Sequence, residues 1–302
     1  MKRPRFDAVD GVLLLDKPEG ISSNAALQRA RRALGADKAG HTGTLDPLAS
    51  GLMALTFGEA TKFSADLLEA DKSYEARIAL GVTTTTGDAE GAVLERRPVA
   101  ASRERFEQAL LGLTGRIEQV PPMYSALKRQ GRPLYALARQ GIEVERAART
   151  VQVYRLWVIE WKESEPRIGV DCSKGLYVRT LAEDIGRALG CGAHLGGLRR
   201  TRVGPFELAQ ATGLDRLEAT DLSERRSRLL AVDALLQSLP RIDLDVEASR
   251  QLGCGRSVAC EVQDASRARV YGPAGRLLGV ASVDGGILTA RRLVNPARSL
   301  ES

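Results

Sequence analysis

The sequence is poor in the residues that bind metals or transfer protons at neutral pH. Its 302 residues include two histidines and four cysteines, and aromatic residues make up 4% of the chain. No Cys-x-x-Cys pair occurs, and the spacing of His41, His194 and the cysteines does not match a zinc site. We therefore expect no bound metal, and free thiols at Cys172, Cys191, Cys254 and Cys260. Acid–base chemistry must then depend on Asp, Glu, Lys or Tyr.

Long apolar runs are also missing. The apolar run at 12–15 is far shorter than the about 18 residues that cross a bilayer. The basic start of the chain has no apolar stretch behind it, unlike a signal peptide. Hydrophobic residues make up 43% and charged residues 27%, as in ordinary globular proteins. We expect a cytoplasmic protein with no membrane partner, and the length suggests about two domains.

The charge balance is basic. The formal net charge is +6, and 36 of the 44 basic residues are arginine. The planar guanidinium fits phosphate oxygens, so a nucleic acid is a reasonable partner. A codon bias toward arginine would give the same ratio, so composition alone leaves both readings open.

Strands and helices follow each other without regular alternation. Alternating or short apolar runs predict strands at 12–15, 52–57, 74–80, 151–161 and 167–172. Helical spacing predicts helices from Ser22 or Ser23 to Leu34, over 103–113, around 135–139 and over 178–189. This pattern favours an α+β fold with a mixed sheet. Near 239–240 the sequence changes to small strands and Gly-rich turns, which predicts domains at 1–239 and 240–302.

The loop from His41 to Gly51 combines chemistry with a rigid backbone. Asp46 precedes Pro47, which favours an extended backbone at the aspartate. Gly43 and Gly51 allow another chain to approach closely. By itself, this pattern is more typical of an aspartate that caps a turn.

The wider sequence resembles a known family. The stretch GHTGTLDPLASGLM (40–53) resembles the active-site motif of the TruB family of tRNA pseudouridine synthases. Further matching blocks lie at 58–62, 120–128, 172–181, 190–195 and 198–200, in family order, so the resemblance covers roughly residues 10–210. Thr44 stands where a small residue is frequent, and the last 60 residues resemble a PUA-type RNA-binding domain only loosely.

The resemblance implies an isomerase with a largely antiparallel sheet flanked by helices. Such an enzyme breaks the N1–C1′ bond of a uridine and rejoins the base through C5. The family substrate is the T-loop uridine at position 55 of tRNA. The resemblance also implies no cofactor, no guide RNA and no obligatory protein partner, and we expect a monomer. Two alternatives are a guide-RNA-dependent relative and an RNA-binding or RNA-folding protein.

The resemblance assigns the central roles to two charged residues. Asp46 is the expected nucleophile, and Arg179 is the expected partner of its carboxylate. A lone Asp can add to the sugar or stabilise its positive charge without a metal. Attack at C1′, attack at C6 and an elimination route remain open. Without the resemblance, Arg179 is an ordinary arginine at a helix start.

Aromatic and basic residues are expected to hold the extruded base. Tyr74 matches the residue that stacks on uracil, and its hydroxyl is a candidate for removing the C5 proton, whereas the pattern alone indicates a core tyrosine. The remaining residues that the resemblance places at the substrate are His41, Tyr177, Leu198, Lys17 and Lys62.

Two basic groups are expected to bind phosphates. The resemblance implies an RNA-gripping insertion at about 121–149, with Glu143 and Glu145 opposing the basic residues Lys128, Arg129, Arg132, Arg139, Arg146 and Arg149. A second group comprises Arg199, Arg200 and Arg202.

Overall fold

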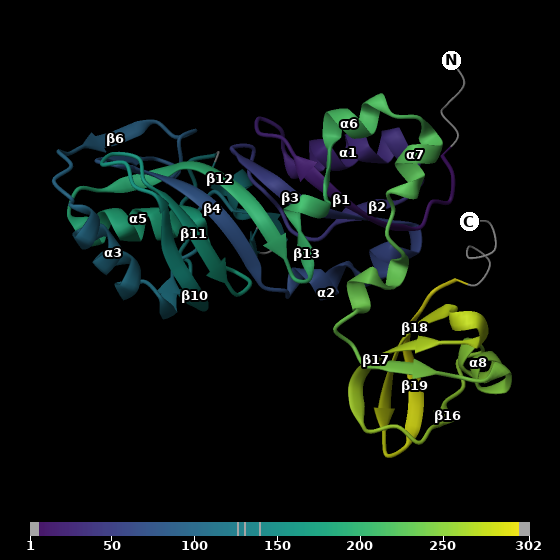
Figure 1. Ribbon diagram of the computed structural model, residues 1–302. Helices are drawn as coiled ribbons and strands as arrows, with labels where there is room; N and C mark the ends of the chain where they lie inside the picture. The colour runs from purple at the N-terminus through teal and green to yellow at the C-terminus, as the bar shows by residue number, and fades with distance from the viewer. Residues whose placement is uncertain (1–5, 126, 130, 139, 296–302) are drawn as a thin grey trace.

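The structure, a computed structural model, describes residues 6–125, 127–129, 131–138 and 140–295. Its larger sheet runs in the order β14-β1-β3-β12-β4-β11-β10-β7, with β2 beside β3 and β13 beside β12 (Figure 1). The strands of this sheet are β1 (Gly11–Lys17), β2 (Ala39–His41), β3 (Ala49–Phe57), β4 (Lys72–Leu80), β7 (Gly115–Gln119), β10 (Arg149–Glu160), β11 (Arg167–Cys172), β12 (Ala193–Val203), β13 (Phe206–Glu207) and β14 (Thr212–Gly213).

The pairing of these strands confirms the predicted fold class. The pairs β1–β14 and β3–β12 are parallel, and the other pairs of this sheet are antiparallel. A mixed, largely antiparallel sheet flanked by helices was the expectation, and the structure shows it. Helix packing and strand pairing then decide which side chains face the two sides of the sheet.

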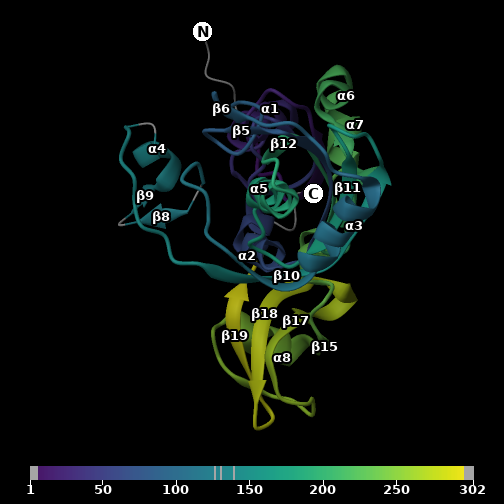
Figure 2. The ribbon, with the colours of Figure 1, turned by 90° about the vertical axis from the view of Figure 1, so that its left-hand side faces the viewer.

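One face of the sheet packs against α1 (Ser23–Leu34) and α5 (Val178–Leu189). Helix α1 begins where the Ser22 side chain accepts a hydrogen bond from the Ala25 amide, and it ends at Gly35 in the left-handed conformation. Helix α5 lies within the curve of the sheet (Figure 2), with α3 (Arg103–Gly112) packed beside it. Helices α6 (Leu214–Ala219) and α7 (Leu222–Ser227) cover α1. This face carries the main core.

The opposite face of β1 and β3 has its own core. Val12, Leu14, Leu52 and Ala54 point to this side and are buried. They are covered by η1 (Gly58–Phe63), α2 (Ser64–Leu68), η2 (Leu208–Gln210) and η3 (Val232–Leu236). The C-terminal domain closes this layer.

The C-terminal domain is β-rich, as predicted. Its sheet has the order β15-β17-β18-β19-β16. The elements are β15 (Arg241–Asp243), α8 (Val246–Gly253), β16 (Val258–Ala259), β17 (Ala265–Tyr271), η4 (Pro273–Gly275), β18 (Leu277–Asp284) and β19 (Ile287–Leu293). Lys62 donates to the Leu293 carbonyl at 3.0 Å, and Arg267 pairs with Asp66, so polar contacts also join the two domains.

Two excursions leave the larger sheet. The hairpin β5 (Val82–Thr84) and β6 (Val93–Arg96) follows β4. Between β7 and β10, the chain forms β8 (Lys128–Arg129), β9 (Arg132–Pro133) and α4 (Leu134–Ala138). Figure 2 shows this predicted insertion as an arm beside the body of the protein. Arg139 of the predicted basic group lies outside the described residues.

One strand begins earlier than predicted. The strand expected at 52–57 starts at Ala49, because residues 49–51 pair in parallel with Leu198–Arg200 of β12. That partner lies about 150 positions away, so no local pattern reveals it. A Cβ at Gly51, where φ is +103°, would lie 2.3 Å from the Arg200 carbonyl oxygen. Glycine therefore permits the close approach that the sequence suggested.

Over the described ranges, no helix is both long and apolar enough to cross a bilayer.

Candidate active site

The structure brings Asp46 and Arg179 together. Nη2 of Arg179 lies 3.1 Å from Oδ2 of Asp46. The Arg179 side chain is 6% exposed, whereas that of Asp46 is 42% exposed. Arg179 also lies 3.5 Å from the buried carboxylate of Asp88 and donates to the carbonyls of Thr86 and Tyr124 at 3.3 and 2.5 Å. Arg179 is thus held by buried groups, while Asp46 stays accessible.

Local hydrogen bonds hold the loop that carries Asp46. Ser23 Oγ, at the start of α1, lies 2.7 Å from both the carbonyl and the amide of Leu45. Thr42 donates its amide and its hydroxyl to the Ala54 carbonyl on β3. The Ala49 amide donates to the carbonyl of Asp46 at 3.0 Å. The loop is therefore tied to a helix and a strand on both sides of the carboxylate.

The Asp46 carboxylate opens into a cavity of about 650 Å³. This volume is within the range of small-molecule sites, so one nucleotide could enter it. The lining residues come from the start of α1, the Asp46 loop, the turn after β5, the insertion and α5. They are Ser22, Ser23, Asn24, His41, Thr44, Leu45, Asp46, Pro47, Thr86, Asp88, Glu90, Tyr124, Ser125 and Arg179.

Opposing effects act on the ionisation of Asp46. Burial raises the pKa of Asp46, and the neighbouring Asp88 raises it further. Arg179 and Lys17 act in the other direction and lower the pKa. The net direction is upward. Arg179 therefore offsets part of the rise in pKa that burial causes, but the pKa of Asp46 stays above its ordinary value.

Tyr74 and Leu198 lie side by side on the sheet behind the loop. Leu198 pairs with Ala76, and Arg200 pairs with Tyr74, so Leu198, Arg200 and Tyr74 share one face. Tyr74 is buried, and burial raises the pKa of its hydroxyl. The charge of Asp46 raises this pKa further, and neither Tyr74 nor Leu198 lines the cavity at Asp46.

Lys17 and His41 flank the site. Lys17 is fully buried on β1, where its amino group donates to the carbonyls of Pro18 and Ile21, and burial lowers its pKa to about 8. His41 lines the cavity, and its buried Nδ1 has no hydrogen-bond partner in the described part of the chain. Burial and the charge of Arg200 lower the pKa of His41, which favours the neutral ring.

Tyr177 and Lys62 occupy different places. Tyr177 is the residue before α5, and its backbone is held by the side chain of Gln119. The charges of Asp46 and Arg179 both act on the Tyr177 hydroxyl. Lys62 does not line the cavity, since its amino group binds Glu59 at 2.5 Å and the Leu293 carbonyl at the junction of the two domains.

The second predicted basic group is wrong for Arg200. This side chain is 2% exposed and cannot reach a phosphate. Residues alternate along β12, so Arg199 and Arg200 point to opposite faces. Arg199 instead pairs with Asp16 at 2.7 Å, and Arg202 donates to Ser73 at 3.0 Å. Both retain partial exposure.

Comparisons with known proteins identify the family. The model "TruB family pseudouridylate synthase (N terminal domain)" matches residues 31–178. Two C-terminal models of the same family, the "tRNA pseudouridylate synthase B C-terminal domain" and "Pseudouridine synthase II TruB, C-terminal", match 179–239 and 240–294. This chain belongs to the TruB family.

Individual TruB relatives extend over nearly the whole chain. A "tRNA pseudouridine synthase B" of Aromatoleum aromaticum is 58% identical, over 95% of this chain and 93% of the relative. The protein of the same name from Burkholderia mallei is 55% identical, over 97% of both chains. The solved "Cbf5-Nop10-Gar1 Complex" has a similar fold, with a TM-score of 0.72 at 24% identity, over 95% of this chain and 85% of that one.

Two carboxylates at the cavity were missed by the sequence analysis, and Arg200 was given the wrong environment. Asp88 and Glu90 lie in the turn between β5 and β6, and Arg200 lies on β12. Burial and the nearby Asp88 raise the pKa of Glu90. The turn has no periodicity that marks its carboxylates, and only the tertiary fold brings it to Arg179. For Arg200, its position two residues after Leu198 predicts the shared face, but nothing local predicts its burial.

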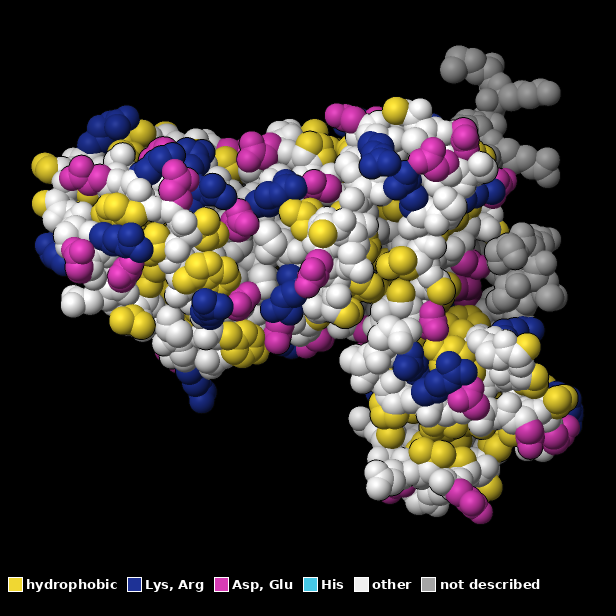
Figure 3. All heavy atoms as spheres, in the orientation of Figure 1, with side chains coloured by type: hydrophobic (Ala, Val, Ile, Leu, Met, Phe, Trp, Pro, Cys, Tyr) yellow, Lys and Arg dark blue, Asp and Glu magenta, His cyan; other side chains and the backbone are white. Residues whose placement is uncertain are grey.

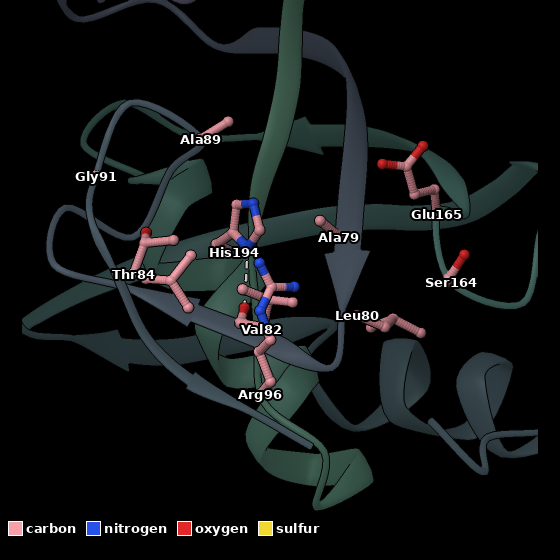
Figure 4. A pocket seen from close by; sticks show the side chains of 11 residues that line it. Ala79, Leu80, Val82, Thr84, Ala89, Gly91, Arg96, Ser164, Glu165 and His194 are labelled. Atoms are coloured by element: carbon pink, nitrogen blue, oxygen red, sulfur yellow. Dashed lines mark hydrogen bonds between the residues drawn. The ribbon is translucent and has the colours of Figure 1, made fainter. Parts of the chain in front are cut away.

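A second cavity of about 390 Å³ lies at the β5–β6 hairpin. Figure 4 shows His194 and Arg96 in it, with Nδ1 of His194 2.9 Å from the Val82 carbonyl. None of the predicted site residues lines this cavity.

On the face in Figure 3, basic and acidic side chains are interspersed, so this face of the TruB fold has no continuous basic surface for RNA.

Proposed function

We propose that this protein converts the uridine at position 55, in the T loop of tRNA, to pseudouridine, with Asp46 as the nucleophile. The observation that carries the proposal is the Asp46–Arg179 ion pair at the wall of a cavity of nucleotide size. Pseudouridine formation in tRNA, by an isomerase, follows already from membership of the TruB family. The proposal adds the target uridine and the residues that act on it.

Asp46 is suited to act on the sugar. Its carboxylate is exposed to the cavity, so it can reach C1′ of an extruded nucleotide or stabilise positive charge there. No water-activating group is needed, because the leaving uracil is recaptured through C5. Arg179 holds the carboxylate in place and favours its ionised form.

The surrounding residues are suited to hold the base. Tyr74 and Leu198 provide an aromatic and an apolar surface on one face of the sheet. His41 lines the cavity, and Tyr177 is the residue before α5, the helix that carries Arg179. Lys17 supplies positive charge beneath the loop. Together they could stack, enclose and orient a flipped uracil.

The insertion is suited to hold the RNA backbone. Arg132 and Arg149 are exposed, and the described residues show no ion pair for either. Tyr124 and Ser125 line the cavity, so the start of the insertion lies at the site. If about six basic groups contact phosphates, tRNA affinity falls by roughly 10³ between 50 and 200 mM salt on duplex-like estimates. Affinity that does not change over this range would contradict the phosphate contacts.

The test uses full-length protein and an unmodified tRNA transcript, without guide RNA. We expect pseudouridine at position 55 and none in a transcript that carries cytidine there. Asp46→Asn keeps the shape of the side chain and should bind tRNA but give no product. Asp215→Asn is the matched control, because Asp215 is exposed on α6. Turnover by Asp46→Asn, or product at another uridine alone, would overturn the proposal.

A further inference from the structure

The second cavity, at the β5–β6 hairpin, is separate from the Asp46 site. Its volume is about 390 Å³, and no described residue lines both cavities. Its walls come from the end of β4, the hairpin, the loop between β10 and β11, and the start of β12. This volume is near the lower end of small-molecule sites, so the cavity has room for an anion and part of the molecule that carries it.

His194 offers one ring nitrogen to this cavity. Its Nδ1 lies 2.9 Å from the Val82 carbonyl oxygen. A carbonyl oxygen only accepts, so Nδ1 carries a hydrogen and donates it. Among the described residues, Nε2 has no hydrogen-bond partner, and the ring is half-buried. Nε2 can therefore bind a ligand, as an acceptor in the neutral ring and as a donor in the protonated ring.

Arg96 brings an unpaired cation to the same cavity. Figure 4 shows its side chain reaching from β6 toward the ring of His194. Arg96 is exposed, and within the described part of the chain its side chain forms no ion pair or hydrogen bond. The next residue, Arg97, differs because it pairs with Glu95 at 2.7 Å. The charge of Arg96 is therefore available to a ligand.

One carboxylate also lines the cavity, but it already has a partner. Glu165 pairs with Arg77 at 3.2 Å. The charge that remains at the described lining is therefore positive. A guanidinium matches the spacing of phosphate oxygens, and hydrogen bonds between charged groups are among the stronger ones in proteins. Because relatives of this chain act on tRNA, phosphate is the anion that such a cavity is expected to meet.

A single segment of chain separates this cavity from the Asp46 cavity. Asp88 lines the Asp46 cavity, whereas the next residue, Ala89, lines the second one. The segment is tied to β12 one residue after His194, because the Ala89 amide donates to the Leu195 carbonyl at 3.0 Å. An RNA strand with one nucleotide in the Asp46 cavity would thus have other phosphates near the second cavity.

We propose that the second cavity binds a phosphate group, with Arg96 and His194 as the residues that hold it. The guanidinium donates hydrogen bonds to the phosphate oxygens, and the protonated ring of His194 donates another from Nε2. The phosphate belongs either to the tRNA backbone or to a free phosphate-bearing molecule, since both present the same oxygens. The inference does not depend on which uridine the protein modifies.

The first test uses the two histidines of the chain, because one lines each cavity. Full-length protein is titrated with sodium phosphate, against sodium chloride at equal ionic strength, and the histidine ring signals are followed by nuclear magnetic resonance. The variant His194→Gln assigns these signals. We expect a saturable shift of the His194 signals and none for His41.

Two neighbouring arginines provide the variant and its matched control. Arg96→Met should weaken phosphate binding by about 10–100-fold, the usual loss of a hydrogen bond between charged groups. Arg97→Met removes the same charge one residue away, from a side chain that pairs with Glu95, and should bind phosphate like wild type.

A second measurement distinguishes the two sources of phosphate. The affinity of an unmodified tRNA transcript is measured at increasing salt for wild type, Arg96→Met and Arg97→Met. If a tRNA phosphate occupies the cavity, Arg96→Met alone reduces the slope of log affinity against log salt by about one. If the occupant is a free phosphate-bearing molecule, the slope stays constant while Arg96→Met still weakens the phosphate titration.

The inference is overturned if phosphate gives no saturable shift at His194 and Arg96→Met leaves the salt slope unchanged. It is also overturned if Arg96→Met and Arg97→Met behave alike in both measurements. Failure of the proposed function is a separate result, because it would appear as missing pseudouridine at position 55, which neither measurement detects.

Discussion

Replacement of Arg179 by methionine should move the pH dependence of catalysis. Two unit charges 3.1 Å apart attract by about 1.3 kcal/mol in water and by about 5 kcal/mol at an effective dielectric constant of 20. Because Asp46 is 42% exposed, solvent screening places the effect near the lower value. We expect the pKa of Asp46 to rise when Arg179 is lost.

The direction of the change in rate follows from the ionised form of Asp46. Arg179 lowers the pKa of this carboxyl, so its loss raises a pKa that burial has already raised. The acid limb of the rate should therefore move to higher pH. At pH values well below that limb, loss of Arg179 should reduce the rate by about 10–100-fold more than it does at high pH.

Stability must be separated from catalysis in this experiment. Without Arg179, the buried Asp88 loses its cation, which costs about 3–5 kcal/mol. The substitution is therefore made in an Asp88→Asn background, with Asp88→Asn alone as the reference. Single-turnover pseudouridine formation is measured from pH 5 to 9, and circular dichroism confirms folding. An acid limb at the same pH in both proteins would refute the electrostatic role of Arg179.

Three further substitutions test the packing of the site. Asp46→Asn should raise Tm at pH 8 but not at pH 4. The folded-state pKa of Asp46 lies above its unfolded value, so the ionised carboxylate opposes folding at pH 8. An unchanged Tm at pH 8 would contradict this expectation. Gly51→Ala should destabilise the protein by about 3 kcal/mol in urea unfolding, from backbone strain and contact with Arg200. Lys62→Ala should speed hydrogen exchange at the junction with the C-terminal domain while single-turnover rates stay constant; a slower rate would place Lys62 at the substrate.

Local sequence signals predicted the elements that depend on neighbours in the chain. Ser22 and Gly35 bound α1 as their capping preferences indicate. The apolar spacing of 178–189 likewise gave α5, and with it the position of Arg179. The rigid loop at Asp46 followed from Pro47 and the flanking glycines, and the resemblance to a family supplied the pairing with Arg179.

Contacts between distant segments could not be predicted in this way. The early start of β3 depends on its parallel pairing with β12. Asp88 reaches Arg179 only because the β5–β6 turn lies over the start of α5. Nothing in the sequence distinguishes Arg200 from the neighbouring arginines, because its burial depends on the strands that pair with β12. Charge patterns therefore located the basic residues but not their environments.

The two buried arginines differ in how their charge is used. Both bind backbone carbonyls, which satisfy a guanidinium without cancelling its charge. Arg179 is also shared between Asp46 and Asp88, so most of its charge is neutralised in the resting site. Among the described residues, no carboxylate forms an ion pair with Arg200. Loss of Asp88 should therefore change the charge around Asp46, whereas loss of Arg200 should loosen the contact of β12 with β3 and with the Gly43 loop.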